Sequence, residues 1–223
     1  MVAQTRNTRV LVVEKPLPVF ASGDVPGKLV SMVVAGVKSI PTKLTNRIRS
    51  RGCRIVVCKN LLEECPRFKN EPLDNGLEEA ERRTWDNLPA ISGRTTFIAE
   101  RYKHDITKKI RRLEDPKETT RHEVCHVVDD YFSYNNWPIS HRTQFRIAYN
   151  KDVGRLALST KRRLFYYIQN TLETGRAEVF ADVLAILCGG GCQKDCTGYS
   201  DEYFLRCFSN SRSYIERNIL NGG

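Results

Sequence analysis

Short apolar runs separated by turn-forming residues characterise the N-terminal part of the chain. The runs 10–13 and 29–37 are separated by prolines and glycines, so we expect residues 1–35 to form an extended N-terminal arm. Residues 53–58 and 95–100 are rich in β-branched and aromatic side chains, which predicts a short strand in each. The pattern therefore indicates a small sheet in this part of the chain.

Helical periodicity appears over 41–50 and dominates from Asp115 onward. Asp115 is followed by Pro116 and by Glu118, which is the pattern of an N-cap and a first helical turn. Further helices are predicted over 140–151, 158–170, 175–188 and 200–220. Strands first and helices last predict an α+β fold, with a small N-terminal sheet followed by a mostly helical C-terminal part.

Composition agrees with one globular domain, which we place at 36–223 after the arm at 1–35. Of the 223 residues, 40% are hydrophobic and 28% charged, as in ordinary globular proteins. Every apolar run is too short to span a bilayer, and the N-terminus lacks the apolar core of a signal peptide. Localisation stays open between the cytoplasm, secretion after processing and export by another route.

The net charge of +10 raises the question of nucleic-acid binding. The basic residues are scattered in pairs, such as 82–83, 108–109 and 162–163, and are not gathered with aromatic residues on one element. Solubility and attraction to an acidic substrate explain the charge equally well. We therefore expect no nucleic-acid partner.

Eight cysteines leave three alternatives open. Cys188, Cys192 and Cys196 recur at intervals of four, but the CxxC spacing of structural zinc sites is absent. Disulfides would form in an oxidising compartment. Buried free thiols are the expected state of Cys53, Cys58 and Cys125, because cysteine behaves as a small hydrophobic residue.

The motif His122-Glu123-Val124-Cys125-His126 carries the most chemistry. Positions i and i+4 share one face of a helix, so both imidazoles can bind one metal ion. Glu123, one step round the helix, points at a water molecule on that metal. Zinc lowers the pKa of such a water, and a neighbouring carboxylate accepts its proton as it attacks a carbonyl group.

A third zinc ligand is expected from Glu178. Glu178 and Asp182 are four apart in a segment that is otherwise largely apolar, and buried carboxylates require partners. Zinc binding by Glu178 with support from Asp182 is one answer, and a salt bridge to an arginine is the other. Asp129 and Asp130 follow His126 by three and four residues, so one of them can accept a hydrogen bond from a ligand imidazole.

These motifs together resemble one family of gluzincin zinc metallopeptidases, which contains the catalytic domain of anthrax lethal factor and the clostridial Pro-Pro endopeptidases. Residues 122–131 resemble the zinc helix of that family. Residues 83–90 are similar to its Arg-Thr-Trp-Asp-x-x-Pro-Gly segment, and 178–182 to its Glu-x-Phe-Ala-Glu. The resemblance covers about residues 40–190 in order.

The resemblance implies a zincin-like fold and one zinc ion held by His122, His126 and Glu178, with Glu123 as general base. It also implies that Asp182 and one of Asp129 and Asp130 hydrogen-bond to the ligands. Substrate would add as a strand to an edge of the sheet, for which we predict 95–100, with substrate contacts from the residues Thr95, Thr96, Phe97 and Ile98. The family has an oxyanion-stabilising tyrosine about two turns before the ligand glutamate, where this chain has Asn170-Thr171-Leu172; Tyr166 and Tyr167 are the nearest tyrosines.

The leading hypothesis is thus a zinc endopeptidase that acts on a protein or peptide. The alternative is a catalytically weakened relative that serves as a protein-binding module, and a nucleic-acid-associated protein is the third. For the substrate, the resemblance suggests either basic residues near the cut or Pro-rich bonds, whereas the positive charge suggests acidic sequences. Neither the oligomeric state nor the substrate is fixed by the sequence.

Overall fold

A computed structural model describes residues 17–70, 84–104, 107–132, 137–168, 173–190 and 199–222. Its strands are β1 (Val19–Ala21), β2 (Arg54–Cys58), β3 (Ala90–Ile91), β4 (Thr95–Ala99), β5 (Arg101–Lys103) and β6 (Ile110–Arg112). Its helices are α1 (Gly27–Lys38), α2 (Thr42–Ser50), α3 (Leu61–Glu64), α4 (Pro116–Tyr131), α5 (Thr143–Arg155), α6 (Leu158–Arg163), α7 (Glu173–Leu187), α9 (Asp201–Cys207) and α10 (Ser209–Ile215). Short 3-10 turns are η1 (Pro66–Asn70), η3 (Trp85–Asn87), η4 (Ile139–His141) and η5 (Phe165–Ile168), and the π-helical turn η6 (Glu216–Leu220) follows α10.

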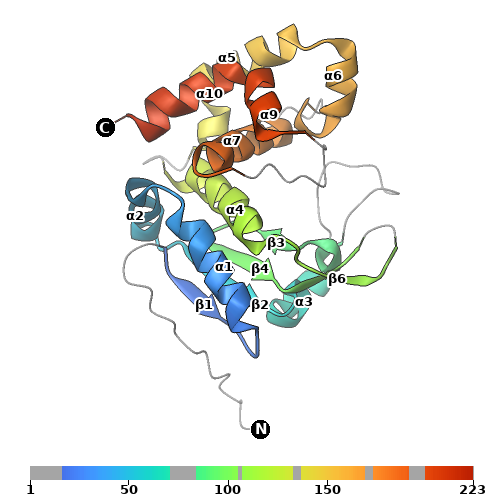
Figure 1. Cartoon of the computed structure of the whole chain (residues 1–223). Coiled ribbons are helices and arrows are strands. Elements are labelled where there is room, and N and C mark those ends of the chain that lie inside the picture. The colour runs from blue at the N-terminus through green and yellow to red at the C-terminus, as the bar shows by residue number, and fades with distance from the viewer. Residues whose placement is uncertain are drawn as a thin grey trace.

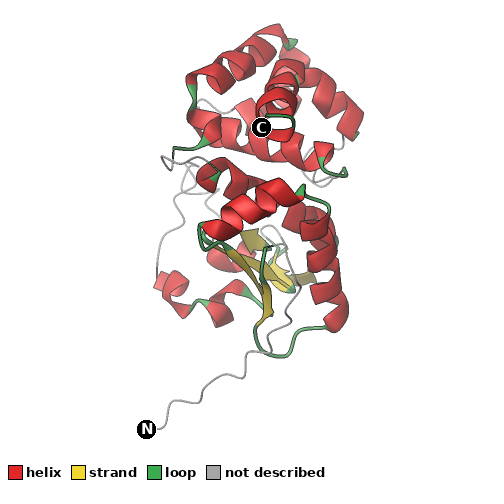
Figure 2. Cartoon of the chain, turned by 90° about the vertical axis from the view of Figure 1, so that its left-hand side faces the viewer, coloured by secondary structure: helices red, strands yellow, loops and turns green. Residues whose placement is uncertain are grey.

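The main sheet has the strand order β1-β2-β4-β3. Strands β1, β2 and β4 run parallel, and β3 pairs antiparallel with β4. Strands β5 and β6 form a separate antiparallel pair. Figure 2 shows the sheet in one half of the molecule and only helices in the other. The mixed α+β architecture predicted from the sequence is thus confirmed.

Helix α4 lies between the sheet and the C-terminal helices (Figure 1). Side chains from the inner face of the sheet, among them Ile55, Val57 and Ile98, are buried with those of α1, α4 and α7 in one hydrophobic core. A smaller cluster around Cys58, Leu61 and Ala99 lies beside α3. A central helix packed on both sides gives its side chains a fixed position relative to both halves.

Gly36 allows α1 and α4 to approach closely. A Cβ atom at position 36 would lie 2.7 Å from the carbonyl oxygen of Lys117 and 3.0 Å from Cβ of Thr120. Both distances are shorter than side-chain contacts normally allow. The absence of a side chain at Gly36 therefore sets the separation of the two helices.

The predicted N-terminal arm is wrong for residues 17–35. Val19–Ala21 pairs with β2, and the apolar run at 29–37 is part of helix α1. Leu29, Val33 and Val37 recur at intervals of four, so α1 buries one helical stripe in the core. Residues 1–16 lie outside the described part of the chain.

Among the described helices, none has both the length and the apolar character needed to cross a membrane. Cys53, Cys58 and Cys125 are buried free thiols, as the sequence predicted. Cys188 is also a free, buried thiol, whereas Cys192 and Cys196 lie outside the described residues. The second metal site considered at these cysteines stays untested.

Candidate metal centre

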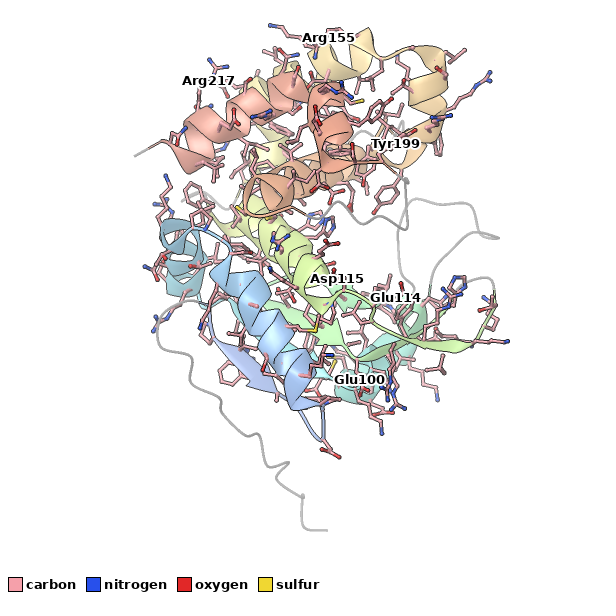
Figure 3. The ribbon with its side chains drawn as sticks, viewed as in Figure 1. Glu100, Glu114, Asp115, Arg155, Tyr199 and Arg217 are labelled. Carbon is pink, nitrogen blue, oxygen red and sulfur yellow. The ribbon has the colours of Figure 1, made fainter. Side chains whose placement is uncertain are left out.

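The predicted histidine pair lies on α4, whose start is fixed by local interactions. The side chain of Asp115 accepts a hydrogen bond from the backbone N–H of Glu118 at 2.9 Å, and Pro116 occupies the first turn. Asp115 is seen at the N-terminal end of the helix in Figure 3. This cap and the core packing of α4 place His122 and His126 on one face of a rigid helix.

His122, His126 and Glu178 converge from two helices, α4 and α7. The Nε2 atoms of the histidines lie 3.0 Å apart. Carboxylate oxygens of Glu178 lie 3.4 Å from Nε2 of His122 and 3.6 Å from Nε2 of His126. One ligand atom from each residue falls within a group whose members are all within 4.8 Å of one another.

These separations fit a zinc ion. Ligand atoms placed tetrahedrally at about 2.0–2.2 Å from zinc are about 3.3–3.6 Å apart, close to the three spacings of His122, His126 and Glu178. Two imidazoles and a carboxylate are also a ligand set of catalytic zinc sites. The donor set therefore suits a zinc ion with a further position open to water or substrate.

Asp182 supports this geometry from behind His122. Its Oδ1 lies 2.6 Å from Nδ1 of His122, and Asp182 is 1% exposed. A hydrogen on Nδ1 leaves the Nε2 lone pair directed toward His126 and Glu178. Glu178 and Asp182 lie on one helix, as the sequence predicted. Asp182 therefore faces Nδ1 of His122, and Glu178 faces Nε2 of the same ring.

The other two predicted carboxylates, Asp129 and Asp130, follow His126 on α4. Asp129 is buried and accepts a hydrogen bond from the backbone N–H of Ser140 at 2.7 Å. Burial raises the pKa of Asp129 to about 6. Burial also raises the pKa of Asp130, whereas the charges of His126 and His141 lower it. Of the predicted supporting carboxylates, Asp182 has the direct contact with a ligand imidazole.

Charge–charge contacts dominate the electrostatics of the centre. Burial lowers the pKa of His122, but Asp182 and Glu178 outweigh burial and raise it well above its ordinary value. The pKa of His126 is also raised, because Glu178 outweighs burial. For Glu178, burial raises the pKa, but the imidazoles of His126 and His122 hold it well below its usual range. The carboxylates therefore favour positive charge at the two imidazoles, and the imidazoles favour the charged form of Glu178.

Glu123 has the position and the pKa of a candidate base. It follows His122 on α4 and is partly buried. Burial raises its pKa above the ordinary carboxylate value, although His122 and His126 act in the opposite direction. A carboxylate with a raised pKa is better matched to proton transfer near neutrality than an ordinary one.

The two candidate tyrosines differ in their surroundings. The hydroxyl of Tyr167 donates a hydrogen bond to Oδ2 of Asp182 at 2.5 Å, and Tyr167 is 1% exposed. Tyr166 is 38% exposed, and its ring centroid lies 5.3 Å from that of Tyr167. The Tyr167–Asp182 contact was not anticipated, because nothing in the sequence spacing indicates it. Oxyanion stabilisation by either tyrosine stays a prediction.

The predicted edge strand requires a correction. Thr95–Ala99 does form strand β4, but it lies between β2 and β3. All five of its residues pair with β2, and Phe97 and Ile98 also pair with β3. Strand order depends on long-range pairing that a single strand pattern does not encode. On this side of the sheet the edge strand is β3, which also packs near α4. Substrate contacts of Thr95, Thr96, Phe97 and Ile98 stay untested.

Comparison with known proteins finds a similar fold among solved structures. No model of a known protein family matches the chain, and no curated protein sequence matches it. Among solved structures, the chain is similar to the Pro-Pro endopeptidase PPEP-2 from Paenibacillus alvei, with a TM-score of 0.54 and 18% sequence identity. The match covers 85% of this chain and 97% of that one. At this identity the similarity shows the fold alone, and it is consistent with the zincin-like fold expected from the sequence.

Proposed function

We propose that this chain is a zinc-dependent endopeptidase of the gluzincin class, related to the Pro-Pro endopeptidases and the lethal factor catalytic domain. The observation that carries the proposal is the convergence of His122, His126 and Glu178 within 4.8 Å. The fold shared with PPEP-2 supports it. The contact of Asp182 with His122 adds the hydrogen bond that zinc-binding histidines normally make.

His122, His126 and Glu178 would hold one zinc ion, and Asp182 would keep His122 in the tautomer that binds it. The zinc ion supplies Lewis acidity, which polarises a carbonyl group and brings the pKa of a water molecule toward neutrality. Glu123 accepts a proton as the water oxygen bonds to the peptide carbonyl carbon. It then delivers that proton to the nitrogen atom as the C–N bond breaks.

The edge of β3 is the proposed place for an extended peptide substrate. Its outer backbone groups can pair with a peptide, which is how edge strands commonly bind extended segments. Strand β3 also packs near α4. A peptide paired with β3 would pass along the helix that carries His122 and Glu123.

Cleavage of a mixed peptide library tests the proposal. The wild-type protein is compared with Glu123→Gln and with Glu114→Gln, an exposed glutamate that precedes α4 and serves as a matched control. We expect one bound zinc in all three proteins. Cutting should be abolished by a chelator and reduced at least about 10³-fold in Glu123→Gln, because the general base is lost.

Two results would contradict the proposal. A wild-type protein that binds no zinc would exclude the metal centre. Zinc binding without cleavage of any peptide would instead favour the alternative, a protein-binding module that keeps the fold.

A further inference from the structure

The sheet carries a groove on the face opposite α1 and α4. Strand residues alternate between the two faces, so Val56 and Phe97 point away from the core side chains Ile55, Val57 and Ile98. These two residues and Ile91 line a groove of about 590 Å³. That volume is within the range of about 300–1,000 Å³ that is typical of ligand sites.

Three arginines surround this apolar floor. Arg54, Arg67 and Arg94 line the groove and are exposed. Among the lining residues that the structure describes, the only acid is Glu64, which accepts a hydrogen bond from the hydroxyl of Ser22. We call this feature the arginine groove. Its lining carries an excess of positive charge over a partly buried apolar surface, and the matching ligand combines carboxylates with apolar groups.

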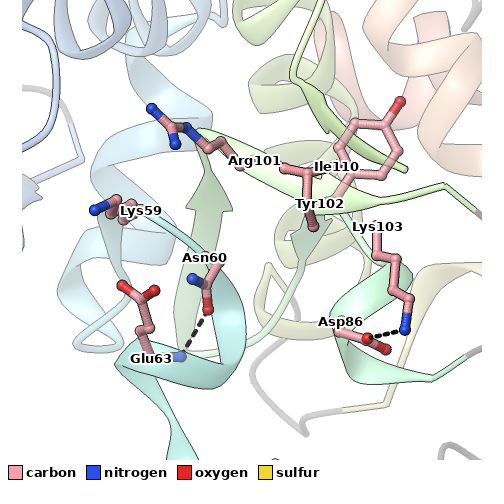
Figure 4. A pocket seen from close by; sticks show the side chains of 8 residues that line it. All are labelled: Lys59, Asn60, Glu63, Asp86, Arg101, Tyr102, Lys103 and Ile110. Atoms are coloured by element: carbon pink, nitrogen blue, oxygen red, sulfur yellow. Dashed lines mark hydrogen bonds and ion pairs between the residues drawn. The ribbon is translucent and has the colours of Figure 1, made fainter. Parts of the chain in front are cut away.

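Another pocket of the same half has a smaller excess of positive charge. It is lined by Lys59, Arg101 and Lys103 together with Glu63 and Asp86. Figure 4 shows the ion pair between Lys103 and Asp86, whose charged atoms lie 3.4 Å apart. Among the described lining residues, cations exceed anions by one in this pocket and by two in the arginine groove, so the groove has the larger positive excess of the two.

The arginine groove ends near the helix that carries the histidines. The guanidinium of Arg94 lies over the ring of Tyr131 at 6.0 Å from its centroid. Tyr131 is the last residue of α4, five positions beyond His126. The arginine groove and the helix of the candidate ligands thus meet at Arg94 and Tyr131.

We infer that the arginine groove binds an extended acidic segment of the peptide substrate, away from the bond that is cut. This inference rests on the proposed peptidase function and adds a substrate class to it. Peptide suits the groove better than nucleic acid does, because Val56 and Ile91 offer aliphatic contact for side chains, whereas base stacking would rely on Phe97, which is half-buried in β4 and is the one aromatic residue among the described lining residues. Arginines around such a floor favour glutamate or aspartate interleaved with apolar residues.

Binding is measured in a Glu123→Gln background, so that a peptide stays intact. The probe is a fluorescein-labelled 12-residue peptide of alternating Glu and Val, compared with a Gln and Val peptide. One variant carries Arg54→Gln, Arg67→Gln and Arg94→Gln. The matched control carries Lys161→Gln, Arg162→Gln and Arg163→Gln on α6 and loses the same three positive charges.

We expect the groove variant to weaken binding of the acidic peptide about tenfold at 0.15 M salt, because three exposed charge pairs each contribute a few-fold. The α6 control should change it less than about twofold. Single Arg67→Glu, on an exposed turn, provides a second variant and should act in the same direction.

Cys65 lines the groove and provides an independent readout. Saturating acidic peptide should slow the alkylation of Cys65 by iodoacetamide. Alkylation of Cys207, a partly exposed free thiol on α9, should be unchanged. Mapping of the modified residues by mass spectrometry separates the two cysteines.

Several results would overturn the inference. These are equal weakening by the groove and α6 variants, equal binding of the neutral peptide, or groove-dependent binding of single-stranded DNA without binding of the peptide. The peptidase proposal fails separately, through loss of zinc or of library cleavage. Binding in the arginine groove without cleavage would contradict the peptidase proposal but not peptide binding by the groove. Cleavage without groove-dependent binding would contradict the groove inference but not the peptidase proposal.

Discussion

Oδ1 of Asp182 lies 2.6 Å from Nδ1 of His122, on the side of the ring that faces away from the other two candidate ligands. The same carboxylate accepts the hydroxyl of Tyr167 through Oδ2. Both oxygens thus accept a hydrogen bond, and the carboxylate is held in a fixed orientation. The position of His122 consequently depends on η5 as well as on its own helix.

We expect Asp182→Asn to weaken zinc binding about 10–100-fold, because a ligand histidine loses its charged hydrogen-bond acceptor. Asp129→Asn is the comparison, since Asp129 contacts Ser140 instead, and it should change zinc affinity less. Competition with a chromophoric chelator measures both. A larger loss in Asp129→Asn would mean that the roles of the two carboxylates are reversed.

Tyr166→Phe and Tyr167→Phe should affect different quantities. The hydroxyl of Tyr167 is engaged by Asp182, so its removal should weaken zinc binding with a smaller effect on kcat at saturating zinc. Tyr166 is the more exposed phenol, and its removal should lower kcat about 10²-fold if it stabilises the oxyanion. Steady-state kinetics with zinc titration separates the two effects. Unchanged kcat in Tyr166→Phe would exclude it as the oxyanion donor.

Zinc affinity should fall as the pH is lowered from 8 to 6. In the metal-free protein, Asp182 and Glu178 raise the pKa of His122, and Glu178 raises that of His126. Both imidazoles therefore take up protons above their ordinary pKa of about 6.5, and each proton competes with the metal. We expect affinity to fall by up to about 100-fold per pH unit where both titrate. Asp182→Asn should shift this fall to lower pH, and a pH-independent affinity would contradict the prediction.

Asp152 on α5 is a fully buried carboxylate that the sequence did not single out. It accepts five hydrogen bonds, from Arg155, from the backbone and side chain of Asn210, and from the backbone and side chain of Ser211. Asp152→Ala should lower the free energy of unfolding by about 3–5 kcal/mol, because buried donors lose their charged partner. Urea unfolding measures this loss. The surface variant Glu202→Ala should stay within about 0.5 kcal/mol of wild type.

Local signals predicted α4 and the histidine pair, because the Asp115 cap and the i, i+4 spacing act within one helix. They also predicted that Glu178 and Asp182 would share a helix. The contact of Tyr167 with Asp182 and the central position of β4 were missed, because both depend on packing between distant segments. The hairpin of β5 and β6 was missed as well. Its strands are only three residues long, and their side chains are not buried.

Gly36 constrains the position of the candidate zinc ligands although it lies on a different helix from all of them. Helix α1 contributes no residue to the candidate zinc ligands, yet its backbone passes so near Lys117 and Thr120 that a methyl group does not fit. Both residues belong to the first turns of α4. A larger residue at position 36 would lift this end of the helix and tilt the histidine pair relative to Glu178. Selection for catalysis would therefore act on position 36, although glycine has no side chain with which to take part in the reaction.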